Sequence, residues 1–253
     1  LCDDITVTLT PGRASRAESN LRFVPCDERN LAVRAANVFF AEIGIGNMGA
    51  RIKMQKRIPV GAGMAGGSSD AAAVLRALNK LCGAGLDRAR LEQLAAHIGS
   101  DVAFCVCGGT QLASGRGELL SPLPSMPECG VVVCKPDFSV STPELFRRLD
   151  AVKLRCHPDT QGIIELLREG DLPKIARRMY NVFEDVPDRR HNEIAAIKSR
   201  MLDWGALGAV MTGTGSAVFG LYDDEKAVER SVRALRREWR CVAPAKIMPR
   251  IDV

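Results

Sequence analysis

The sequence is poor in aromatic residues and histidines, and it has no long hydrophobic run. Aromatic residues make up 5% of the 253 residues, and there are three histidines. No apolar stretch approaches the roughly 18 residues of a membrane-spanning helix, so no membrane partner is expected. The histidines show no metal-ligand spacing. No metal-binding residues are therefore assigned.

Charge of one sign is also not concentrated anywhere. The net charge is +5, and arginine pairs are scattered at residues 147–148, 177–178, 189–190 and 236–237, without interleaved aromatics. Nucleic-acid binding needs a concentrated basic stripe. The pairs are interpreted as solvated helix faces, and no nucleic-acid partner is expected.

The nine cysteines form no Cys-x-x-Cys pair. Cys105 and Cys107 would share one face of a strand. Reduced thiols in a cytoplasmic protein fit this pattern better than disulfides or a zinc site. The N-terminus lacks the features of a signal peptide. Because the first residue is Leu1, we expect that residues precede it.

Strand and helix patterns are mixed along the chain, which predicts two α+β domains. Three prolines in PLPSMPECG, residues 122–130, place the boundary between domains 1–126 and 127–253. Strands are expected at residues 4–9, 50–58, 102–109, 110–120, 131–136, 208–223 (two strands around a turn) and 241–248. Helices are expected from Asn30 to about 43, from Ser68 or Ser69 to Leu81, from Asp87 to Gly99, at 141–150 with Thr142 as cap, over most of 160–203, and at 225–239. Residues 11–20 read as a polar turn.

The densest glycine segment is PVGAGMAGGSSDAAA, residues 59–73, which joins a strand pattern to a helical one. Glycines before a helix expose several backbone N–H groups, and the helix N-terminus adds positive potential. Together these features predict a phosphate-binding loop. Ser68 and Ser69 would add hydroxyl groups or cap the helix.

Three known patterns of phosphate-binding loop are candidates for this segment. The P-loop fails, because no lysine follows the glycines. The dinucleotide fingerprint is formally matched by Gly61, Gly63 and Gly66, but it requires a βαβ unit that the pattern does not predict. The third pattern, Pro-x-x-x-Gly-Leu-x-x-x-Ser-Ser before a helix, is matched with Met64 in place of leucine. In this respect the chain resembles the GHMP small-molecule kinases, which include galactokinase, homoserine kinase and mevalonate kinase.

The resemblance extends over most of the chain. Besides the loop, it includes RNLAVRAA, GSDVAF, KPDFSVSTPELFRRLD, YNVFE and MTGTGSAVFG, in that order. These segments resemble the GHMP kinases of the non-mevalonate isoprenoid pathway, which phosphorylate the 2-hydroxyl of a cytidine-diphosphate methylerythritol (CDP-methylerythritol). The resemblance implies a two-domain GHMP fold with an N-terminal ATP-binding domain and a C-terminal α/β sandwich.

The resemblance also implies ATP and Mg²⁺ as cofactors and assigns roles to individual residues. Asp101 would orient the attacking hydroxyl or accept its proton. Thr142, Phe146 and Gly213 would belong to the substrate side, with Phe146 stacking on cytosine and Arg116 nearby. Gly213 and Gly215 would form a second glycine turn on the phosphate side. The nucleotide-binding residues would be Asn30, Lys56, Pro59, Val60, Gly61, Ala62, Gly63, Met64, Ala65, Gly66, Gly67, Ser68 and Ser69.

One departure from the family concerns the front of the chain. The family's opening segment carries a lysine and an asparagine at the transfer centre and a Tyr-His pair at the cytosine, and this sequence does not contain it. An N-terminal truncation is therefore expected, and an inactive nucleotide-binding remnant stays an alternative. Another GHMP kinase, with a homoserine or mevalonate-like substrate, is the other alternative. The expected state is a cytoplasmic monomer or homodimer.

Overall fold

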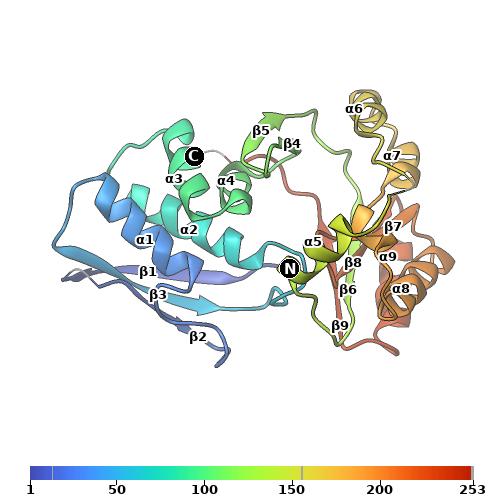
Figure 1. Ribbon diagram of the computed structural model, residues 1–253, viewed down its shortest axis with the longest axis horizontal. Coiled ribbons are helices and arrows are strands. Elements are labelled where there is room, and N and C mark those ends of the chain that lie inside the picture. The colour runs from blue at the N-terminus through green and yellow to red at the C-terminus, as the bar shows by residue number, and fades with distance from the viewer. Residues whose placement is uncertain (13, 155, 252–253) are drawn as a thin grey trace. The chain divides into compact units, whose positions relative to one another are not determined.

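The computed structural model describes residues 1–12, 14–154 and 156–251 (Figure 1). They form two compact units. The N-terminal unit comprises residues 2–58, residues 65–122 and the residues from Pro249. The C-terminal unit comprises Leu1, residues 59–64 and residues 123–248. The domain boundary expected at residues 126 and 127 stays a prediction; the two units change over at Pro122 and exchange two short segments.

A three-stranded sheet forms one layer of the N-terminal unit. Its strands are β1 (Asp4–Pro11), β2 (Arg16–Ser19) and β3 (Met48–Gln55), in the order β1-β3-β2. β1 runs antiparallel to β3, and β2 runs parallel to it. β2 was not expected, because its segment is mostly polar. Its one deeply buried side chain is Ala17, at 3% exposure, so the strand carries almost no hydrophobic signal.

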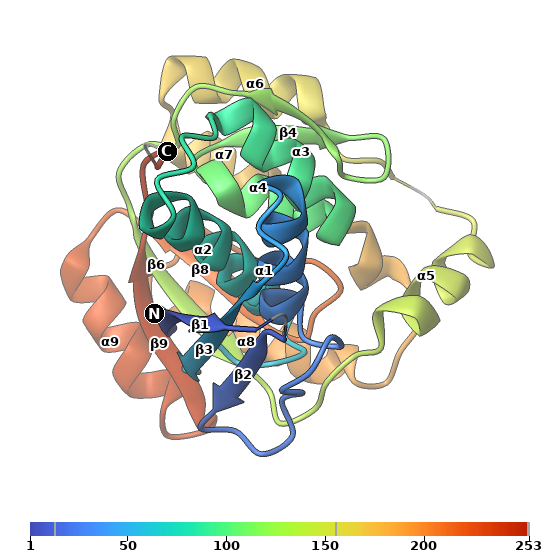
Figure 2. The same cartoon turned by 90° about the vertical axis from the view of Figure 1, so that its left-hand side faces the viewer.

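Helices cover one face of this sheet (Figures 1 and 2). α1 (Leu31–Glu42) and α2 (Gly66–Leu81) share a core with β3, and α3 (Arg88–Ile98) and α4 (Ser100–Cys107) complete it. Asn30 and Asp87, where the sequence predicts that two helices begin, cap α1 and α3, each accepting a backbone N–H through its side chain. A hairpin of β4 (Gln111–Ser114) and β5 (Leu119–Pro122) follows.

The prediction of a strand at residues 102–109 was wrong, because most of the segment is helix α4. Its buried residues are Val102, Ala103, Val106 and Cys107, at the spacing of a helix face. Cys107 is fully buried and Cys105 only partly so. The two thiols therefore do not share a strand face. An apolar run as short as residues 102–107 predicts a strand and a two-turn helix equally well, so its sequence alone does not distinguish them.

The C-terminal unit is built on an antiparallel sheet. Its strands are β6 (Gly130–Lys135), β7 (Gly208–Met211), β8 (Val218–Tyr222) and β9 (Cys241–Lys246), in the order β7-β8-β6-β9. Its helices are α5 (Thr142–Asp150), α6 (Thr160–Glu169), α7 (Leu172–Arg178), the 3-10 helix η1 (Val182–Asp185), α8 (His191–Asp203) and α9 (Glu225–Leu235).

Helices pack on both faces of this sheet. Val132 and Cys134 of β6 pack in one hydrophobic cluster with α8 and α9, and Val131 and Val133 pack in another with α7. The sheet thus lies between two helical layers, as predicted for a sandwich.

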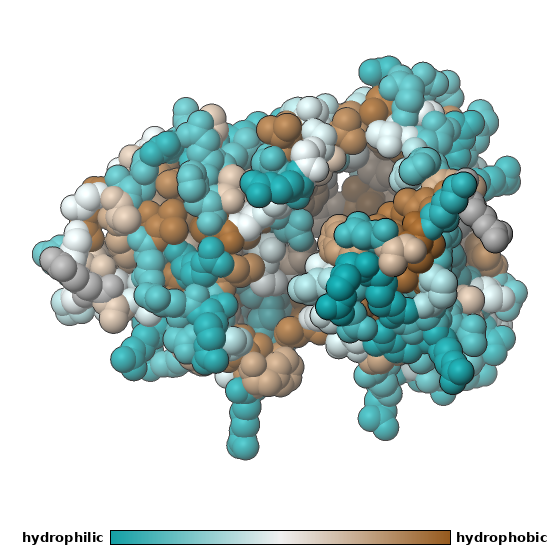
Figure 3. All heavy atoms as spheres, viewed as in Figure 1, coloured by the Kyte–Doolittle hydropathy of each residue, from teal (hydrophilic) through white to brown (hydrophobic). Residues whose placement is uncertain are grey.

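The exterior of both units is mainly hydrophilic on the face shown in Figure 3. Among the residues that the structure describes, no helix is both long enough and apolar enough to span a bilayer.

Candidate functional site: the glycine loop and a cavity in the C-terminal unit

The first half of the glycine loop, which we define as residues 59–69, lies in the C-terminal unit. There it packs on the turn formed by residues 212–215. Thr212 Oγ1 donates to the carbonyl of Gly63 at 3.0 Å, and Ala217 N donates to the carbonyl of Ala62 at 3.1 Å. Gly63 has a positive φ of 71°, and a Cβ there would lie 2.2 Å from the Thr212 carbonyl oxygen. Only glycine allows two backbones to approach this closely.

The glycines of the facing turn meet a similar requirement. Gly213 has a φ of 52°, and a Cβ there would lie 3.0 Å from the Gly63 carbonyl oxygen. Gly215 has a φ of 82°, and a Cβ there would lie 2.5 Å from Met211 Sδ. The two glycine segments that the sequence singled out therefore contact each other.

The second half of the loop enters the N-terminal unit and opens α2. Ala65 adopts a left-handed conformation, with φ of 49°, and α2 begins at Gly66. The expectation that Ser68 or Ser69 caps the helix was wrong. Both lie in its first turn, and Ser69 Oγ donates to the Gly66 carbonyl at 2.9 Å. Since a first turn leaves its N–H groups without intrahelical partners, those of residues 66–68 are oriented to bind an anion.

A buried group of three charges joins the two ends of this segment. Lys56 Nζ lies 2.6 Å from Asp70 Oδ2 and is also paired with Asp3, and each of the three side chains is at most 5% exposed. Asp3 Oδ1 accepts the backbone N–H groups of Arg57 at 2.5 Å and Ile58 at 2.8 Å. The strand before the loop and the helix after it are thereby tied together. The Lys56 ammonium is committed to these carboxylates, and the position of Lys56 beside the nucleoside stays a prediction.

The two carboxyl groups differ in pKa. Burial raises the pKa of Asp70 to about 6, although the hydrogen bond from Lys56 opposes this shift. Burial also acts on Asp3, but the hydrogen bonds from Lys56, Arg57 and Ile58 lower its pKa below the usual range. Asp70 is thus the group of the triad that titrates near neutral pH.

Two further predicted residues lie in the N-terminal unit with specific local partners. Asn30 caps α1 through Ala32 N at 2.9 Å and donates to the Pro25 carbonyl at 2.7 Å. Its side-chain amide is therefore occupied, and its contact with adenosine stays a prediction. Arg116 lies in the turn between β4 and β5, where its N–H donates to Glu118. Its place near a substrate also stays a prediction.

Asp101 occupies the first turn of α4, directly after Gly99 ends α3. The cap position belongs to Gly99, so Asp101 is not an N-cap. Its side chain is exposed, and it lies close enough to Cys105 for its charge to raise the pKa of that thiol, although burial is the larger cause. A carboxylate in this position is able to orient a hydroxyl group or accept its proton.

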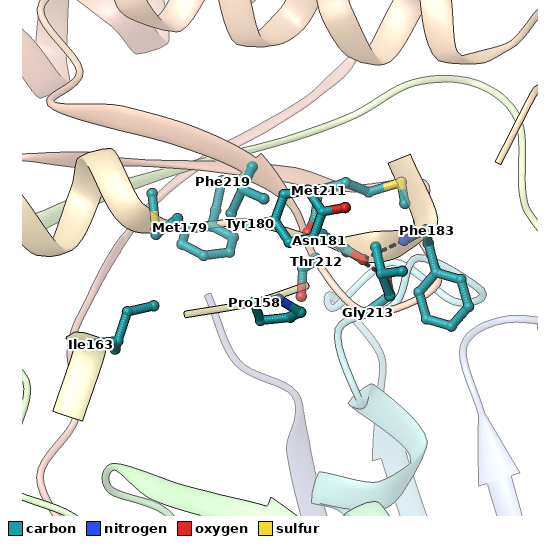
Figure 4. A pocket seen from close by; sticks show the side chains of 12 residues that line it. Pro158, Ile163, Met179, Tyr180, Asn181, Phe183, Met211, Thr212, Gly213 and Phe219 are labelled. Carbon is teal, nitrogen blue, oxygen red and sulfur yellow. Dashed lines mark hydrogen bonds between the residues drawn. The ribbon is translucent and has the colours of Figure 1, made fainter. Parts of the chain in front are cut away.

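The C-terminal unit contains a cavity of about 420 Å³ (Figure 4). Tyr180, Asn181 and Phe183 form one part of its wall, and Thr212 and Gly213 form another. The remaining lining residues are Pro158, Ile163, Met179, Val182, Val210, Met211 and Phe219. A mainly apolar wall with a few polar groups is typical of small-molecule sites of this volume.

The predicted substrate residues lie next to this wall. Gly213 lines the cavity. Thr142 Oγ1 lies 2.9 Å from Thr214 Oγ1, and the Phe146 ring packs edge-on against Phe183, with ring centroids 5.0 Å apart. Phe146 is half exposed, which leaves part of its ring accessible. The structure thus brings these three residues together.

The sequence alone assigns no role to individual residues of YNVFE, residues 180–184, four of which line the cavity. Their signal was present in the motif, but hydrophobic periodicity could not show that a short 3-10 segment forms the cavity wall. The dinucleotide alternative was wrong, because α2 is followed by α3 rather than by a parallel partner of β3 in a βαβ unit.

Comparisons with known proteins define the class. Residues 30–109 match the GHMP kinases N-terminal domain, and residues 163–241 match the GHMP kinases C-terminal domain. A crystal structure of homoserine kinase from Cytophaga hutchinsonii superimposes with a TM-score of 0.78 at 20% identity, covering 99% of this chain and 87% of that one. At that identity the likeness shows the fold alone, which is that of a GHMP kinase.

More similar proteins narrow the class. The chain is 45% identical to 4-diphosphocytidyl-2-C-methyl-D-erythritol kinase of Bacillus velezensis over 236 residues, covering 93% of this chain and 81% of the relative. It is 44% identical to the enzyme of that name from Bacillus subtilis, with the same coverage. A crystal structure of 4-(cytidine 5'-diphospho)-2C-methyl-D-erythritol kinase matches with a TM-score of 0.77 at 33% identity, covering 96% of this chain and 85% of that one. The chain belongs to the 4-diphosphocytidyl-2-C-methyl-D-erythritol kinase family, and it is an ATP-dependent kinase of a small molecule.

Proposed function

We propose that the protein transfers the γ-phosphoryl group of ATP to the 2-hydroxyl of 4-diphosphocytidyl-2-C-methyl-D-erythritol, in the non-mevalonate isoprenoid pathway. The observation that carries the proposal is the 45% identity to enzymes of that name over 93% of the chain. The packing of the two glycine segments against each other supports the phosphate-binding part of the activity.

The proposed binding mode divides the substrates between residues already described. The N–H groups of the glycine loop hold the ATP phosphates, since phosphoryl transfer depends mainly on positioning and charge neutralisation. Asp101 orients the acceptor hydroxyl or takes its proton. Thr142, Phe146 and the cavity of Figure 4 receive the cytidine end of the acceptor.

Mg²⁺ is proposed to enter with ATP. Among the described residues there is no group of three or more His, Cys, Asp and Glu side chains able to hold a metal. In kinases, Mg²⁺ is commonly held by phosphate oxygens and water with only one or two protein ligands. We propose the same arrangement here. The ion supplies neutralisation of the phosphate charge. The hydroxyl of Ser68 is the side chain of the loop that we propose as a candidate ligand.

A cytoplasmic location is proposed on the basis of the thiols. All nine cysteines lie among the described residues and are free, and Cys2, Cys26 and Cys156 are exposed. Exposed free thiols are typical of a reducing compartment. The expectation of a monomer or homodimer, with no nucleic-acid or membrane partner, stays a prediction.

Incubation of the full-length protein with ATP, Mg²⁺ and each candidate alcohol tests the proposal. We expect phosphorylation of 4-diphosphocytidyl-2-C-methyl-D-erythritol with formation of one ADP per product. Turnover of homoserine or mevalonate, without turnover of the cytidine compound, would overturn it.

A further inference from the structure

Asn181 belongs to the cavity wall and also holds the backbone of a neighbouring segment (Figure 4). Its Nδ2 donates to the carbonyl oxygens of Met211 and Gly213, both at 2.8 Å. Its Oδ1 accepts the N–H of Phe183 at 3.0 Å and so caps η1. One amide side chain therefore makes three hydrogen bonds to backbone and joins two parts of the same wall.

Glu184, three residues further along, reinforces this connection. Its Oε1 accepts the N–H of Met211 at 2.8 Å, and its other carboxylate oxygen is paired with Lys198. The side chains of Asn181 and Glu184 thus bind three backbone atoms of the facing segment: the N–H and the carbonyl of Met211, and the carbonyl of Gly213. Charge-assisted and multiple hydrogen bonds of this kind fix a backbone more firmly than one neutral bond does.

Thr212, between these two anchored residues, contacts the glycine loop through both its side chain and its backbone. Its Oγ1 donates to the Gly63 carbonyl at 3.0 Å, and its own carbonyl lies against Gly63 so closely that no Cβ fits between them. A continuous series of contacts therefore runs from the cavity through Asn181 and Thr212 to Gly63. All of these residues belong to the C-terminal unit.

We propose that Asn181 is a positioning residue that links occupancy of the cavity to the conformation of the glycine loop, so that acceptor and nucleotide bind cooperatively. This inference rests on the proposed function of the two sites. A ligand in the cavity orders the wall that contains Asn181. The turn at residue 212, and with it the backbone at Gly63, is then already ordered when ATP binds. Prior ordering of this kind lowers the cost of binding the second ligand.

The test measures the Kd of a non-hydrolysable ATP analogue by calorimetry, with and without saturating 4-diphosphocytidyl-2-C-methyl-D-erythritol. For the wild type we expect the acceptor to tighten nucleotide binding about 5-fold or more, within the usual range of coupling between sites. Asn181→Asp retains the acceptor for Phe183 N but removes both donors to residues 211 and 213. We expect its coupling to fall to less than 2-fold.

A second variant pair keeps the inference testable if Asn181→Asp does not fold. Thr212→Val removes the hydroxyl that reaches Gly63, and Thr212→Ser retains it. We expect loss of coupling in the first and wild-type coupling in the second. Asn79→Asp is the control. Asn79 of α2 also bonds to backbone on both sides of its amide: it donates to the Leu86 carbonyl at 2.8 Å and accepts the Leu86 N–H at 3.0 Å. Its coupling should equal that of the wild type.

The outcomes separate this inference from the proposed function. If the wild type phosphorylates the acceptor but shows no coupling, or if Asn181→Asp and Thr212→Val both retain it, the inference is wrong and the function stands. If the wild type neither binds nor phosphorylates the acceptor, the proposed function itself fails.

Discussion

The ammonium nitrogen of Lys56 lies 2.6 Å from a carboxylate oxygen of Asp70, and both side chains are almost completely buried. Asp3 is paired with the same ammonium, so two carboxylates share one cation. Buried ion pairs seldom add net stability, but their geometry is specific. Here the pairs fix the end of the strand before the glycine loop to the first turns of the helix after it. We infer that the triad holds this part of the loop in its binding conformation.

Replacing Lys56 by methionine should be strongly destabilising. The substitution leaves two buried carboxylates without their cation, and removal of one partner from a buried pair typically costs about 3–5 kcal/mol. We expect a decrease of that size in the free energy of unfolding, measured by urea titration at pH 7.5. Lys80→Met, at an exposed lysine near the end of α2, is the control and should cost less than about 1 kcal/mol. Equal losses for the two variants would contradict this role of the triad.

Asp70→Asn should change how stability depends on pH. Because the folded-state pKa of Asp70 is raised from 3.8 to about 6, this group favours folding at low pH, and that stabilisation is lost as the pH rises through about 6. Asparagine does not titrate. The stability of the variant relative to the wild type should therefore increase between pH 4 and pH 7, by about 2 kcal/mol. Chemical denaturation at several pH values measures the difference. A difference that is flat, or that decreases with pH, would show that the pKa is not raised.

Alanine substitutions at two loop glycines should distinguish the cost of backbone strain from the cost of a steric clash with the turn at residues 212–215. Gly61 and Gly63 both have positive φ, at 65° and 71°. A Cβ at Gly61 meets only Ser139 atoms, at ordinary contact distances of 3.5 Å or more, whereas one at Gly63 collides with the Thr212 carbonyl. Gly61→Ala should cost about 1–2 kcal/mol of stability from strain. Gly63→Ala should cost a further 1–3 kcal/mol or so from overpacking.

The same pair should differ in catalysis. Since the collision displaces the loop backbone, we expect the KM for ATP to rise about 10-fold or more in Gly63→Ala and to change less in Gly61→Ala. Steady-state kinetics at saturating acceptor provide the measurement. Indistinguishable KM values for the two variants would mean that the contact with the 212–215 turn does not set the loop conformation.

Asp101→Asn should abolish most of the activity without unfolding the protein. A positioned acid or base contributes about 10²–10⁴-fold to turnover, and we expect kcat to fall by that factor. The side chain is exposed and caps no helix, so the free energy of unfolding should change by less than about 0.5 kcal/mol. Glu225→Gln is the control, since Glu225 also occupies the first turn of a helix, α9. If both variants keep wild-type kcat, Asp101 has no catalytic role.

Sequence patterns predicted the elements whose signals are local. The starts of α1 and α3 at Asn30 and Asp87, the strand β3 and the helix α2 follow from hydrophobic periodicity and its punctuation by polar residues and glycines. β2 is not predictable from its own residues, because it is a strand through its parallel pairing with β3. The sequence predicts a strand where α4 lies, because a run of six apolar residues, 102–107, is too short for its periodicity to separate helix from strand.

The candidate site was predictable only in part. Glycine and serine content indicated the loop, and the motifs indicated Asp101, Thr142 and Gly213. The partners of Lys56 were not predictable, since Asp3 lies 53 residues away in sequence and the pairing depends on the register between β1 and β3. The same holds for Asn181, whose hydrogen bonds reach residues 30 and 32 positions further along.

A crystal structure of the protein with an ATP analogue and Mg²⁺ tests the account most directly. We predict that the β- and γ-phosphates lie against residues 61–69, within hydrogen-bonding distance of the N–H groups that open α2. Phosphates bound elsewhere, with those N–H groups still facing solvent, would contradict it.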